Sequence, residues 1–521
     1  MTTTTKLVLL KLLILTHGSY SALADQSQNR SEFYTSVVRM EQLLQTELAI
    51  LDRLDAFIVK SEDQLRLLKR KRDRFHAEIS GAAENPIPFV SNPISAFLMT
   101  KRLVKDYWEV DALIRKGVGV EVIAGSTVLP SEEDLQGIAE GLSRLQEVYK
   151  MKAVELALGK VYGHNPVREL TVEECYRIGK AMAQGQCFAN ANQWFREALL
   201  RLRVEESLGV SRFEILDYYS YSLSEVGRYK EALELTNELL EINSTYVGGI
   251  VKKKVIEDWL YRIEKSGRKR KRPTSALLTL YEKLCRGDYV RPVEVTSQLF
   301  CRYETSASAF LQLAPLKQEA INLDPFIVIY HEAVTDREIT RLIELARPQI
   351  KRSAVGDTKN ELVSKYRISQ NTWLGDDDDP LVATINRRAK DMAGGLNEQS
   401  YEKLQVNNYG LGGFYSIHYD WSRNAVPFPN MGVGNRIATL MFYLSDVEQG
   451  GATVFPRLNL AVRPRKGTAI FWYNLRRNGK GDKRTLHAAC PVLVGSKWVA
   501  NKWIHEYHQE FVRPCELDPK K

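Results

Sequence analysis

Residues 33–75 repeat apolar side chains at the spacing of a coiled coil. Counted in heptads from Val37, nine of the twelve seam positions are apolar. The twelve are Val37, Met40, Leu44, Glu47, Leu51, Leu54, Ile58, Ser61, Leu65, Leu68, Arg72 and Phe75. Such a repeat predicts a long helix whose seam is covered by another helix. We expect self-association through residues 37–75, with packing on a helix of the same chain as the alternative.

The pattern breaks at Asn85-Pro86-Ile87-Pro88 and again at Asn92-Pro93, and a second helix is predicted around 95–114. From about 132 to 265 the periodicity is helical throughout. Residues 227–233 match the turn and second helix of a tetratricopeptide unit, in which the small Ala232 lets two helices approach. A poorer copy runs from Cys175 to about Leu202, with Ala198 in the comparable place. A plain helical spacer is the alternative.

Two tyrosines of this helical region lie on one helical face. Tyr218 and Tyr221 are three residues apart in the run Asp217-Tyr218-Tyr219-Ser220-Tyr221. On a concave surface, such rings pack on the proline rings of a polyproline II peptide, and their hydroxyls bond its exposed carbonyls. Burial in the core is the competing interpretation.

After Asp324-Pro325 the pattern changes to short β-rich runs cut by Gly and Pro. Strands are predicted over Ile437–Leu444, Ala469–Tyr473 and Lys497–Ile504, with helices near 336–346 and 381–392 outside them. Residues 266–318 read as a linker. The fold class is therefore α+β and multidomain: helical regions first, then an all-β domain with a few helices.

The N-terminus predicts a compartment. Residues 1–24 combine Lys6, a short apolar core and Ala22-Leu23-Ala24, which together are typical of a secretory signal. No later stretch approaches eighteen apolar residues, so no membrane span is expected. An oxidising lumen permits the six cysteines to form disulfides, and Asn29 and Asn243 open glycosylation sequons. The chain ends without a KDEL-type signal, so we expect a partner to retain it.

The net charge of +9 adds little to this picture. Part of the excess lies in the basic run 268–272, which is compatible with a nucleic-acid patch or a solvated linker. A secretory signal favours the linker, and no nucleic-acid partner is expected.

Candidate chemistry lies in the C-terminal region, where four of the eight histidines follow residue 417. His418 and Asp420 are two apart, so on a strand both point to one face. His487 from a later strand completes two histidines and one carboxylate, the facial triad of non-haem Fe(II) oxygenases, which leaves coordination positions open. A zinc hydrolase could use the same ligands, but no general base accompanies them.

Lys497 strengthens the iron hypothesis. On a strand over 497–505, Lys497, Val499, Asn501, Trp503 and His505 share one face. A lysine inside a barrel is costly unless a carboxylate meets it. A dicarboxylate cosubstrate would supply that carboxylate while its other end chelates iron. The alternative register puts Lys497 in water.

With these residues in place, the chain resembles the alpha subunit of collagen prolyl 4-hydroxylases along nearly its whole mature length. The strongest stretches are Asn408–Asp420, Asn430–Val454, Lys466–Leu475 and His487–Glu510. The resemblance implies a double-stranded β-helix (jelly-roll) catalytic domain, with His418, Asp420 and His487 as Fe(II) ligands. It also implies Lys497 as the residue that binds the distal carboxylate of 2-oxoglutarate.

The resemblance implies further roles. His505 would assist cosubstrate binding or decarboxylation, Tyr409 and Trp503 would line the cosubstrate pocket, and Tyr218 and Tyr221 would belong to a peptide-substrate groove. Cys285 would pair with Cys301, and Cys490 with Cys515. The resemblance also implies O2 as the second cosubstrate, ascorbate as the reductant that rescues oxidised iron, and protein disulfide isomerase as the retaining partner in the endoplasmic reticulum lumen.

The predicted domains are a signal peptide (1–24), a coiled-coil dimerisation region (25–131), a tetratricopeptide-like peptide-binding domain (132–265), a linker with a cysteine pair (266–318) and a catalytic domain (319–521). The expected reaction forms 4-hydroxyproline in collagen-like X-Pro-Gly peptides while 2-oxoglutarate is decarboxylated to succinate. The alternatives are a non-catalytic subunit that binds proline-rich peptides and a related dioxygenase acting on lysine or on non-collagen substrates.

Overall fold

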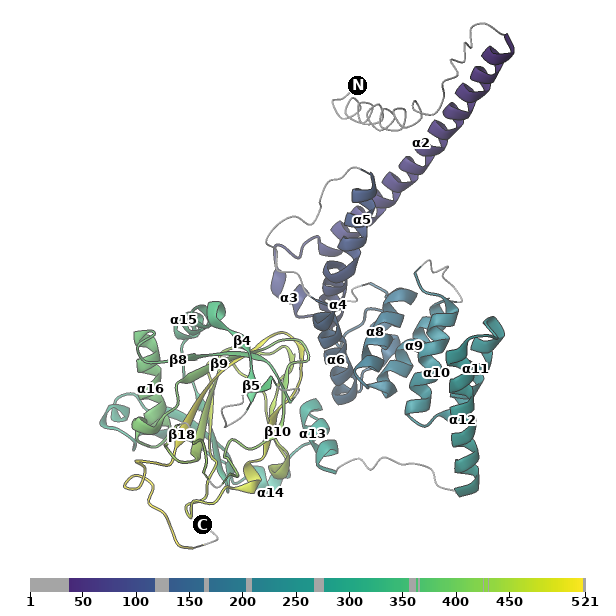
Figure 1. Ribbon diagram of the computed structural model, residues 1–521. Coiled ribbons are helices and arrows are strands. Elements are labelled where there is room, and N and C mark those ends of the chain that lie inside the picture. Colours follow the sequence, from purple (N-terminus) through teal and green to yellow (C-terminus); the bar gives the residue numbers. More distant parts are fainter. Residues whose placement is uncertain are drawn as a thin grey trace. The chain divides into compact units, whose positions relative to one another are not determined.

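The structure of the protein is a computed structural model (Figure 1). It describes residues 37–117, 131–163, 168–202, 209–266, 276–355, 362–363, 366–424, 426–429 and 431–518. The predicted signal segment, the Asn29 sequon and the basic run 268–272 lie outside these residues. Within the described part, no helix is both long and apolar enough to cross a membrane. The chain divides into two compact units at Ser80/Gly81.

The described part of the first unit is one long helix, α2 (Val37–Ile79). It confirms the helix predicted over 33–75 from residue 37 onward, and residues 33–36 lie outside the described part. Seam side chains are exposed on the single chain: Leu51, Leu54 and Leu65 are 50%, 41% and 53% exposed. Apolar side chains in that arrangement offer a surface to a second helix. Self-association through residues 37–75 stays a prediction.

Short helices open the second unit. The helix predicted around 95–114 is present as three consecutive segments, α4 (Pro93–Lys101), the π-helical η2 (Arg102–Asp106) and α5 (Tyr107–Gly117). The Asn92 side chain caps α4 by accepting hydrogen bonds from the N–H groups of Ile94 and Ser95. The neighbouring helices are α3 (Pro86–Val90), α6 (Glu132–Tyr149) and α7 (Ala153–Ala157).

Antiparallel helix pairs follow, as the tetratricopeptide-like pattern predicts. They are α8 (Val172–Gln184), α9 (Phe188–Leu202), α10 (Arg212–Glu225), α11 (Tyr229–Ile242) and α12 (Val247–Ser266). Capping boxes begin α8 and α10. Ala198 and Ala232 are fully buried, as expected for small residues at close helix contacts.

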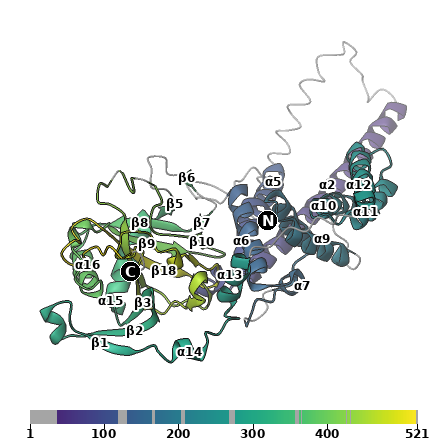
Figure 2. The same ribbon diagram turned by 90° about the horizontal axis from the view of Figure 1, so that it is seen from below.

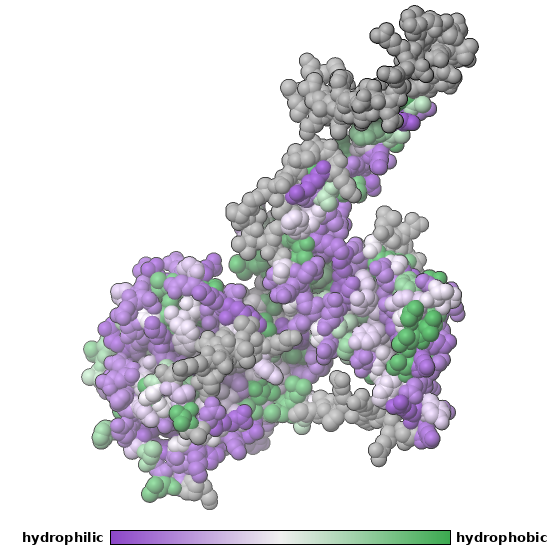
Figure 3. All heavy atoms as spheres, viewed as in Figure 1, coloured by the Kyte–Doolittle hydropathy of each residue, from purple (hydrophilic) through white to green (hydrophobic). Residues whose placement is uncertain are grey.

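Hydrophobic side chains gather at the surface over the last helices of this array (Figure 3). On α12, Val247 and Val251 are 70% and 56% exposed, and Ile250 and Val255 are exposed as well. Terminal repeats usually present a polar outer face. Helix α12 differs from that pattern, because its exposed side chains make the end of the helical array apolar.

The segment 266–318, predicted as a linker, contains defined elements. They are α13 (Ala276–Arg286), α14 (Val293–Thr296), β1 (Cys301–Glu304) and the 3₁₀ turn η3 (Ala309–Gln312). Helix α13 lies between α6 and the strands of the catalytic domain (Figures 1 and 2). Strand β1 pairs antiparallel with β2, so part of the segment belongs to the main sheet.

The catalytic domain is built on a nine-stranded sheet in the order β1-β2-β3-β15-β11-β18-β9-β8-β4. After β1 its strands are β2 (Leu316–Leu323), β3 (Phe326–His331), β4 (Lys351–Arg352), β8 (Gln370–Leu374), β9 (Leu404–Tyr409), β11 (Arg436–Tyr443), β15 (Ala469–Tyr473) and β18 (Lys497–His505). The three predicted strands are confirmed as β11, β15 and β18.

A five-stranded sheet in the order β14-β13-β16-β10-β7 carries the histidines. Its strands are β7 (Arg367–Ile368), β10 (Phe414–His418), β13 (Thr453–Phe455), β14 (Leu460–Val462) and β16 (His487–Ala489). Two small sheets pair β5 (Ala354–Val355) with β6 (Leu362–Val363) and β12 (Gln449–Gly450) with β17 (Val492–Val494).

One core cluster combines side chains of both sheets, among them Tyr409, Tyr443, Phe455, Trp472 and Val499. A second core fills the other face of the large sheet, where α15 (Asp336–Ala346) and α16 (Pro380–Met392) pack (Figure 1). Both helices confirm the sequence prediction. The two sheets and the antiparallel pairing agree with the predicted jelly roll.

The cysteine pairing differs from the prediction. Cys285 on α13 is bonded to Cys490, which follows β16, and their Cα atoms are 5.5 Å apart. Cys301 is a free, exposed residue at the start of β1. The predicted Cys285–Cys301 and Cys490–Cys515 bonds are therefore wrong. The physical reason is that α13 packs on β13 and β14 beside β16 rather than running free ahead of the sheet.

Candidate active site

His418, Asp420 and His487 converge as the sequence predicts. One ligand atom from each lies within 4.8 Å of the others. Nε2 of His418 is 3.5 Å and Nε2 of His487 is 3.6 Å from Asp420 Oδ1. Strands β10 and β16 pair directly at His418 and His487, and this register brings the two imidazoles together. The arrangement offers two nitrogens and one oxygen to a single ion.

Backbone carbonyls orient both imidazoles. His418 Nδ1 donates to the Ser416 carbonyl at 2.7 Å, and His487 Nδ1 donates to the Thr485 carbonyl at 3.0 Å. Because Nδ1 carries the proton in each ring, Nε2 keeps its lone pair toward Asp420. Such outer hydrogen bonds fix the tautomer that metal ligation requires.

Asp420 is held by its other carboxylate oxygen. Oδ2 accepts hydrogen bonds from Thr439 Oγ1 at 2.7 Å and from Trp503 Nε1 at 3.0 Å. Asn474 Nδ2 donates to Thr439 Oγ1 at 2.8 Å, and Trp472 Nε1 donates to Asn474 Oδ1 at 2.8 Å. This buried chain leaves Oδ1 directed at the two histidines.

The electrostatics of the triad suit a cation. Burial would raise the pKa of Asp420, but the neighbouring His487 and His418 hold it well below its usual range. Burial, followed by the charge of His418, lowers the pKa of His487 to about 4. An ionised carboxylate beside a neutral imidazole is the protonation state in which both bind a metal. The donor set therefore fits Fe(II).

Lys497 points into the barrel, not into water. It is 1% exposed, and its Nζ donates to the Gly451 carbonyl at 2.7 Å. Burial lowers its pKa to about 7. Among the described residues, no carboxylate forms an ion pair with it. A buried amine without a counter-charge fits the distal carboxylate of 2-oxoglutarate.

Aromatic hydroxyl side chains surround this lysine. Tyr409 on β9 sits directly opposite Lys497 on β18, and its ring centroid is 5.8 Å from Nζ. The Tyr443 ring lies 5.7 Å from Nζ, and its hydroxyl donates to Thr453 Oγ1 at 2.9 Å. Tyr409 was predicted from the sequence but Tyr443 was not, because both faces of β11 are buried and largely apolar and alternation does not tell which face lines the barrel.

His505 occupies the far end of the same strand face. Its Nε2 is 2.8 Å from Glu402 Oε1 and its Nδ1 is 2.8 Å from the Gly434 carbonyl. Burial would raise the pKa of Glu402, but Arg436 and His505 lower it to about 2. The Arg436 guanidinium lies 3.9 Å from the Trp503 ring centroid. His505 is thus linked to Asp420 through neighbours, and its cosubstrate role stays a prediction.

Two further residues near His418 were not predicted from the sequence: Tyr415 contacts its ring, and Arg367 contacts Tyr415. The Tyr415 ring stacks on His418 with centroids 3.5 Å apart. Arg367, buried on β7, lies 4.9 Å from the Tyr415 ring centroid and donates to Gln405 and Asn407. Period-two alternation separates Tyr415 from the His418 face, and the bulge recorded between them in β10 makes the contact possible.

The groove tyrosines lie among other aromatic side chains. The Tyr218 ring meets Tyr176 edge-on at 6.0 Å, with Lys180 Nζ 5.0 Å from its centroid. Tyr221 is 42% exposed and meets Phe188 edge-on at 5.7 Å. Tyr219, between them, is buried in the core, so of these three neighbouring tyrosines Tyr218 and Tyr221 are the two with accessible faces.

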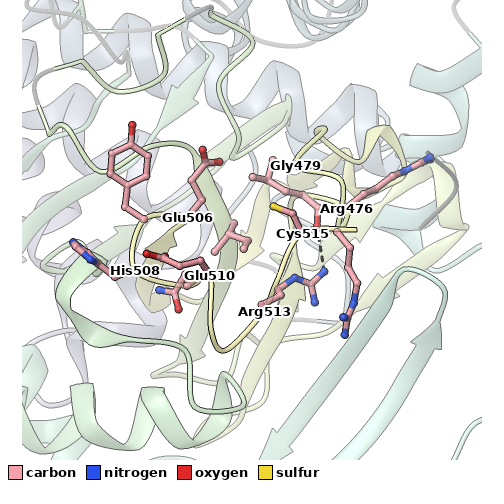
Figure 4. Close-up of a pocket in the computed structure, with 12 residues that line it drawn as sticks. Arg476, Gly479, Glu506, His508, Glu510, Arg513 and Cys515 are labelled. Carbon is pink, nitrogen blue, oxygen red and sulfur yellow. Dashed lines mark hydrogen bonds between the residues drawn. The ribbon is translucent and has the colours of Figure 1, made fainter. Parts of the chain in front are cut away.

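Cys515 lies in a different cavity of the catalytic domain. Figure 4 shows its sulfur beside Arg476, Gly479 and Arg513. None of the three iron ligands lines this cavity. The predicted bond to Cys490 does not form, because Cys490 is bonded to Cys285 and Cys515 is a free, exposed thiol.

Three family models match consecutive parts of the chain. Residues 36–163 match the prolyl 4-hydroxylase alpha-subunit N-terminal region, 172–260 the prolyl 4-hydroxylase peptide-substrate-binding domain, and 404–505 the 2OG-Fe(II) oxygenase superfamily. Prolyl 4-hydroxylase subunit alpha-2 of Gallus gallus is 37% identical over 93% of this chain and 95% of its own length. The chain belongs to the prolyl 4-hydroxylase alpha-subunit family.

Other members are equally similar. Subunit alpha-1 of Rattus norvegicus is 38% identical over 93% of this chain and 96% of its own. Subunit alpha-2 of Caenorhabditis elegans is 37% identical over 94% of each chain. Among solved structures, the viral collagen prolyl hydroxylase of Paramecium Bursaria Chlorella virus-1 is 28% identical, with a TM-score of 0.29, and covers 34% of this chain and 94% of its own.

Proposed function

We propose that the chain is the catalytic alpha subunit of a prolyl 4-hydroxylase, which forms 4-hydroxyproline in collagen-like X-Pro-Gly peptides and converts 2-oxoglutarate to succinate. One observation carries the proposal. The buried Lys497, which has no carboxylate partner among the described residues, lies in the same barrel as the His418, Asp420 and His487 triad. This reaction needs a site for Fe(II) and, in the same barrel, a site for the carboxylate of 2-oxoglutarate that does not bind the iron.

His418, Asp420 and His487 would hold Fe(II), and Lys497 would bind the distal carboxylate of 2-oxoglutarate. When bound, iron and 2-oxoglutarate supply the oxidising chemistry with O2, and ascorbate would restore iron that becomes oxidised. The protein contributes orientation. Thr439 and Trp503 fix the Asp420 carboxylate, while Ser416 and Thr485 fix the imidazoles.

The helical array would bind the substrate chain. Tyr218 and Tyr221 present accessible rings suited to proline. Long proline-rich chains offer many equivalent segments, so binding at the array raises their concentration at the iron site. This division places affinity in α8–α12 and chemistry in the jelly roll.

Compartment and partners follow from the sequence. Secretion into the endoplasmic reticulum lumen would follow from the signal segment 1–24. Asn243 is an exposed residue at the end of α11, accessible for glycosylation. Protein disulfide isomerase would be the retaining partner, and the exposed seam of α2 would join two alpha subunits.

The experiment is tandem mass spectrometry of a Pro-Pro-Gly repeat peptide incubated with the chain, co-expressed with protein disulfide isomerase, Fe(II), ascorbate and 2-oxoglutarate. One added oxygen on the proline that precedes glycine is the expected product. Oxygen on lysine of a matched lysine-containing peptide, and none on proline, would favour a different dioxygenase. No product from a folded, iron-loaded complex would favour a non-catalytic peptide-binding subunit.

A further inference from the structure

Helix α6 touches the chain immediately before the strand that carries His418 (Figures 1 and 2). Gly141 on α6 and Gly412 in the turn ahead of β10 meet backbone to backbone. A Cβ atom at position 412 would lie 2.9 Å from the Gly141 Cα, and Gly412 has a φ of +61°. Both features require glycine at position 412.

Side chains of α6 add polar contacts beside the Gly141–Gly412 backbone contact. Arg144 Nε donates to the Gly412 carbonyl at 3.3 Å, and its guanidinium lies 4.9 Å from the Phe414 ring centroid. The Tyr149 hydroxyl donates to the Pro491 carbonyl at 2.6 Å. We call this set of contacts the α6 contact; it consists of Gly141, Arg144 and Tyr149 on α6 together with Gly412 and Pro491.

The α6 contact joins the two segments that carry the histidines. Gly412 N–H donates to the Val492 carbonyl at 2.9 Å, and Val492 N–H donates to the Gly413 carbonyl at 3.0 Å. Gly413 precedes β10, which ends at His418, and Pro491 lies four residues after His487. A shift of either segment would therefore move one imidazole relative to the other.

The opposite side of α6 is fixed by the helical array. Gln136 Nε2 donates to the Ala181 carbonyl at 2.6 Å on α8. From α9, Asn190 Nδ2 donates to the Ser143 carbonyl at 3.1 Å, and Trp194 Nε1 donates to Gln146 Oε1 at 2.8 Å. Helix α6 is thus anchored on one side and contacts the histidine segments with the other.

We propose that α6 is a positioning element for the iron site, in which Gly141, Arg144 and Tyr149 set the spacing of His418 and His487. The inference rests on the proposed function, in that the two histidines are taken as iron ligands. In the described part of the chain, Arg144 and Tyr149 donate to the Gly412 and Pro491 carbonyls and not to the three iron ligands. They act through the glycine turn ahead of β10 and the segment after β16.

Paired glycine variants test the proposal in the full-length complex. Gly141→Leu inserts a side chain at the contact, where a Cβ alone already lies 3.6 Å from the Leu411 carbonyl oxygen. Gly137→Leu, one turn earlier on the same face of α6, changes an exposed glycine with nothing within 4 Å of its Cβ and is the matched control. The readout is Co(II) affinity, measured by titration without substrate or turnover. We expect a loss of about tenfold or more for Gly141→Leu and wild-type affinity for Gly137→Leu.

Arg144→Ala removes the polar contact without adding bulk and covers the case in which Gly141→Leu does not fold. We expect weaker Co(II) binding and a kcat on a short peptide lowered on the order of tenfold, with the KM of a long peptide unchanged because the tyrosine groove is intact. Arg144→Lys retains a cationic donor and should recover part of both losses. Wild-type metal affinity in Arg144→Ala would overturn the inference.

The metal titration also separates this inference from the proposed function. If the wild-type complex binds Co(II) but hydroxylates no proline, the proposed function fails while the role of α6 is still measured. If the wild type hydroxylates proline and all α6 variants bind metal equally well, only the role of α6 is refuted.

Discussion

The indole N–H of Trp503 donates a 3.0 Å hydrogen bond to Oδ2 of Asp420, 83 residues away in the chain. Thr439 donates to the same oxygen at 2.7 Å. Because both donors engage Oδ2, the other oxygen is the one left for the metal. The orientation of the carboxylate is therefore set by two strands of the large sheet, although Asp420 itself follows β10.

Trp503→Phe should weaken metal binding. The substitution keeps an aromatic ring of similar shape but removes the N–H, so Asp420 can rotate away from the histidines. We expect Co(II) affinity to fall by about tenfold to a hundredfold, measured by titration. Trp498→Phe is the matched control, because Trp498 lies on the opposite face of the same strand. Equal affinities for the two variants would contradict the role given to Trp503.

The affinity for 2-oxoglutarate should depend on the protonation of Lys497. Burial lowers its pKa to about 7 in the unliganded chain, and a bound carboxylate raises it again. At a pH between the pKa of Lys497 in the free chain and its pKa in the complex, the binding of 2-oxoglutarate is accompanied by protonation of Lys497. The affinity should therefore be constant below about pH 7 and fall by up to about tenfold per pH unit above it.

Calorimetric titration of 2-oxoglutarate at several pH values checks this dependence. Lys497→Arg supplies the control, because a guanidinium stays protonated throughout the range, so its binding should be weaker but independent of pH. The same slope in Lys497→Arg and in the wild type would show that another group titrates.

The disulfide Cys285–Cys490 should be found by peptide mapping under non-reducing conditions. It links α13 to the end of β16 across 205 residues. Cys490→Ser should cost roughly 2–4 kcal/mol of unfolding free energy, measured by denaturant unfolding. Cys301→Ser, which alters an exposed free thiol, should stay within about 0.5 kcal/mol of wild type. A linked peptide that contains Cys285 and Cys301 would refute the pairing.

Sequence patterns predicted the parts of the site that depend on local geometry. His418 and Asp420 were predicted to share a strand face. In the structure β10 ends at His418 and Asp420 lies two residues beyond it, yet the two side chains still converge. The alternation along 497–505 correctly placed Lys497 and Trp503 on one face. The partners of Glu402 could not be anticipated, because Arg436 and His505 reach it only through the packing of three strands.

The cysteine pairing likewise depends on tertiary packing that the sequence pattern does not reveal. Connectivity cannot be deduced from the positions of cysteines alone, and the predicted pairing came from the resemblance. Helix α13 packs on the five-stranded sheet, and this tertiary contact brings Cys285 to Cys490. The long helix α2 and helices α15 and α16 were predicted well because their apolar periodicity is local.

Tyr221→Ala should weaken the binding of a long Pro-Pro-Gly peptide. The ring is 42% exposed, so its loss removes contact area for proline while the helical core is preserved. We expect about a tenfold weaker Kd by fluorescence anisotropy, with turnover of a short peptide unchanged. Tyr303→Ala, which removes a 67% exposed tyrosine on β1, should bind like wild type. If both variants bind alike, the groove lies elsewhere.

Succinate release by the complex, with and without a Pro-Pro-Gly peptide, tests the central claim most directly when wild type is compared with His418→Ala. The account predicts peptide-dependent succinate, matched by hydroxyproline, from the wild type. His418→Ala should give neither product, yet bind the long peptide with wild-type affinity, because the proposed groove residues Tyr218 and Tyr221 lie on α10, whereas the histidines lie on β10 and β16. Undiminished turnover in His418→Ala, or loss of peptide binding in a folded His418→Ala complex, would contradict it.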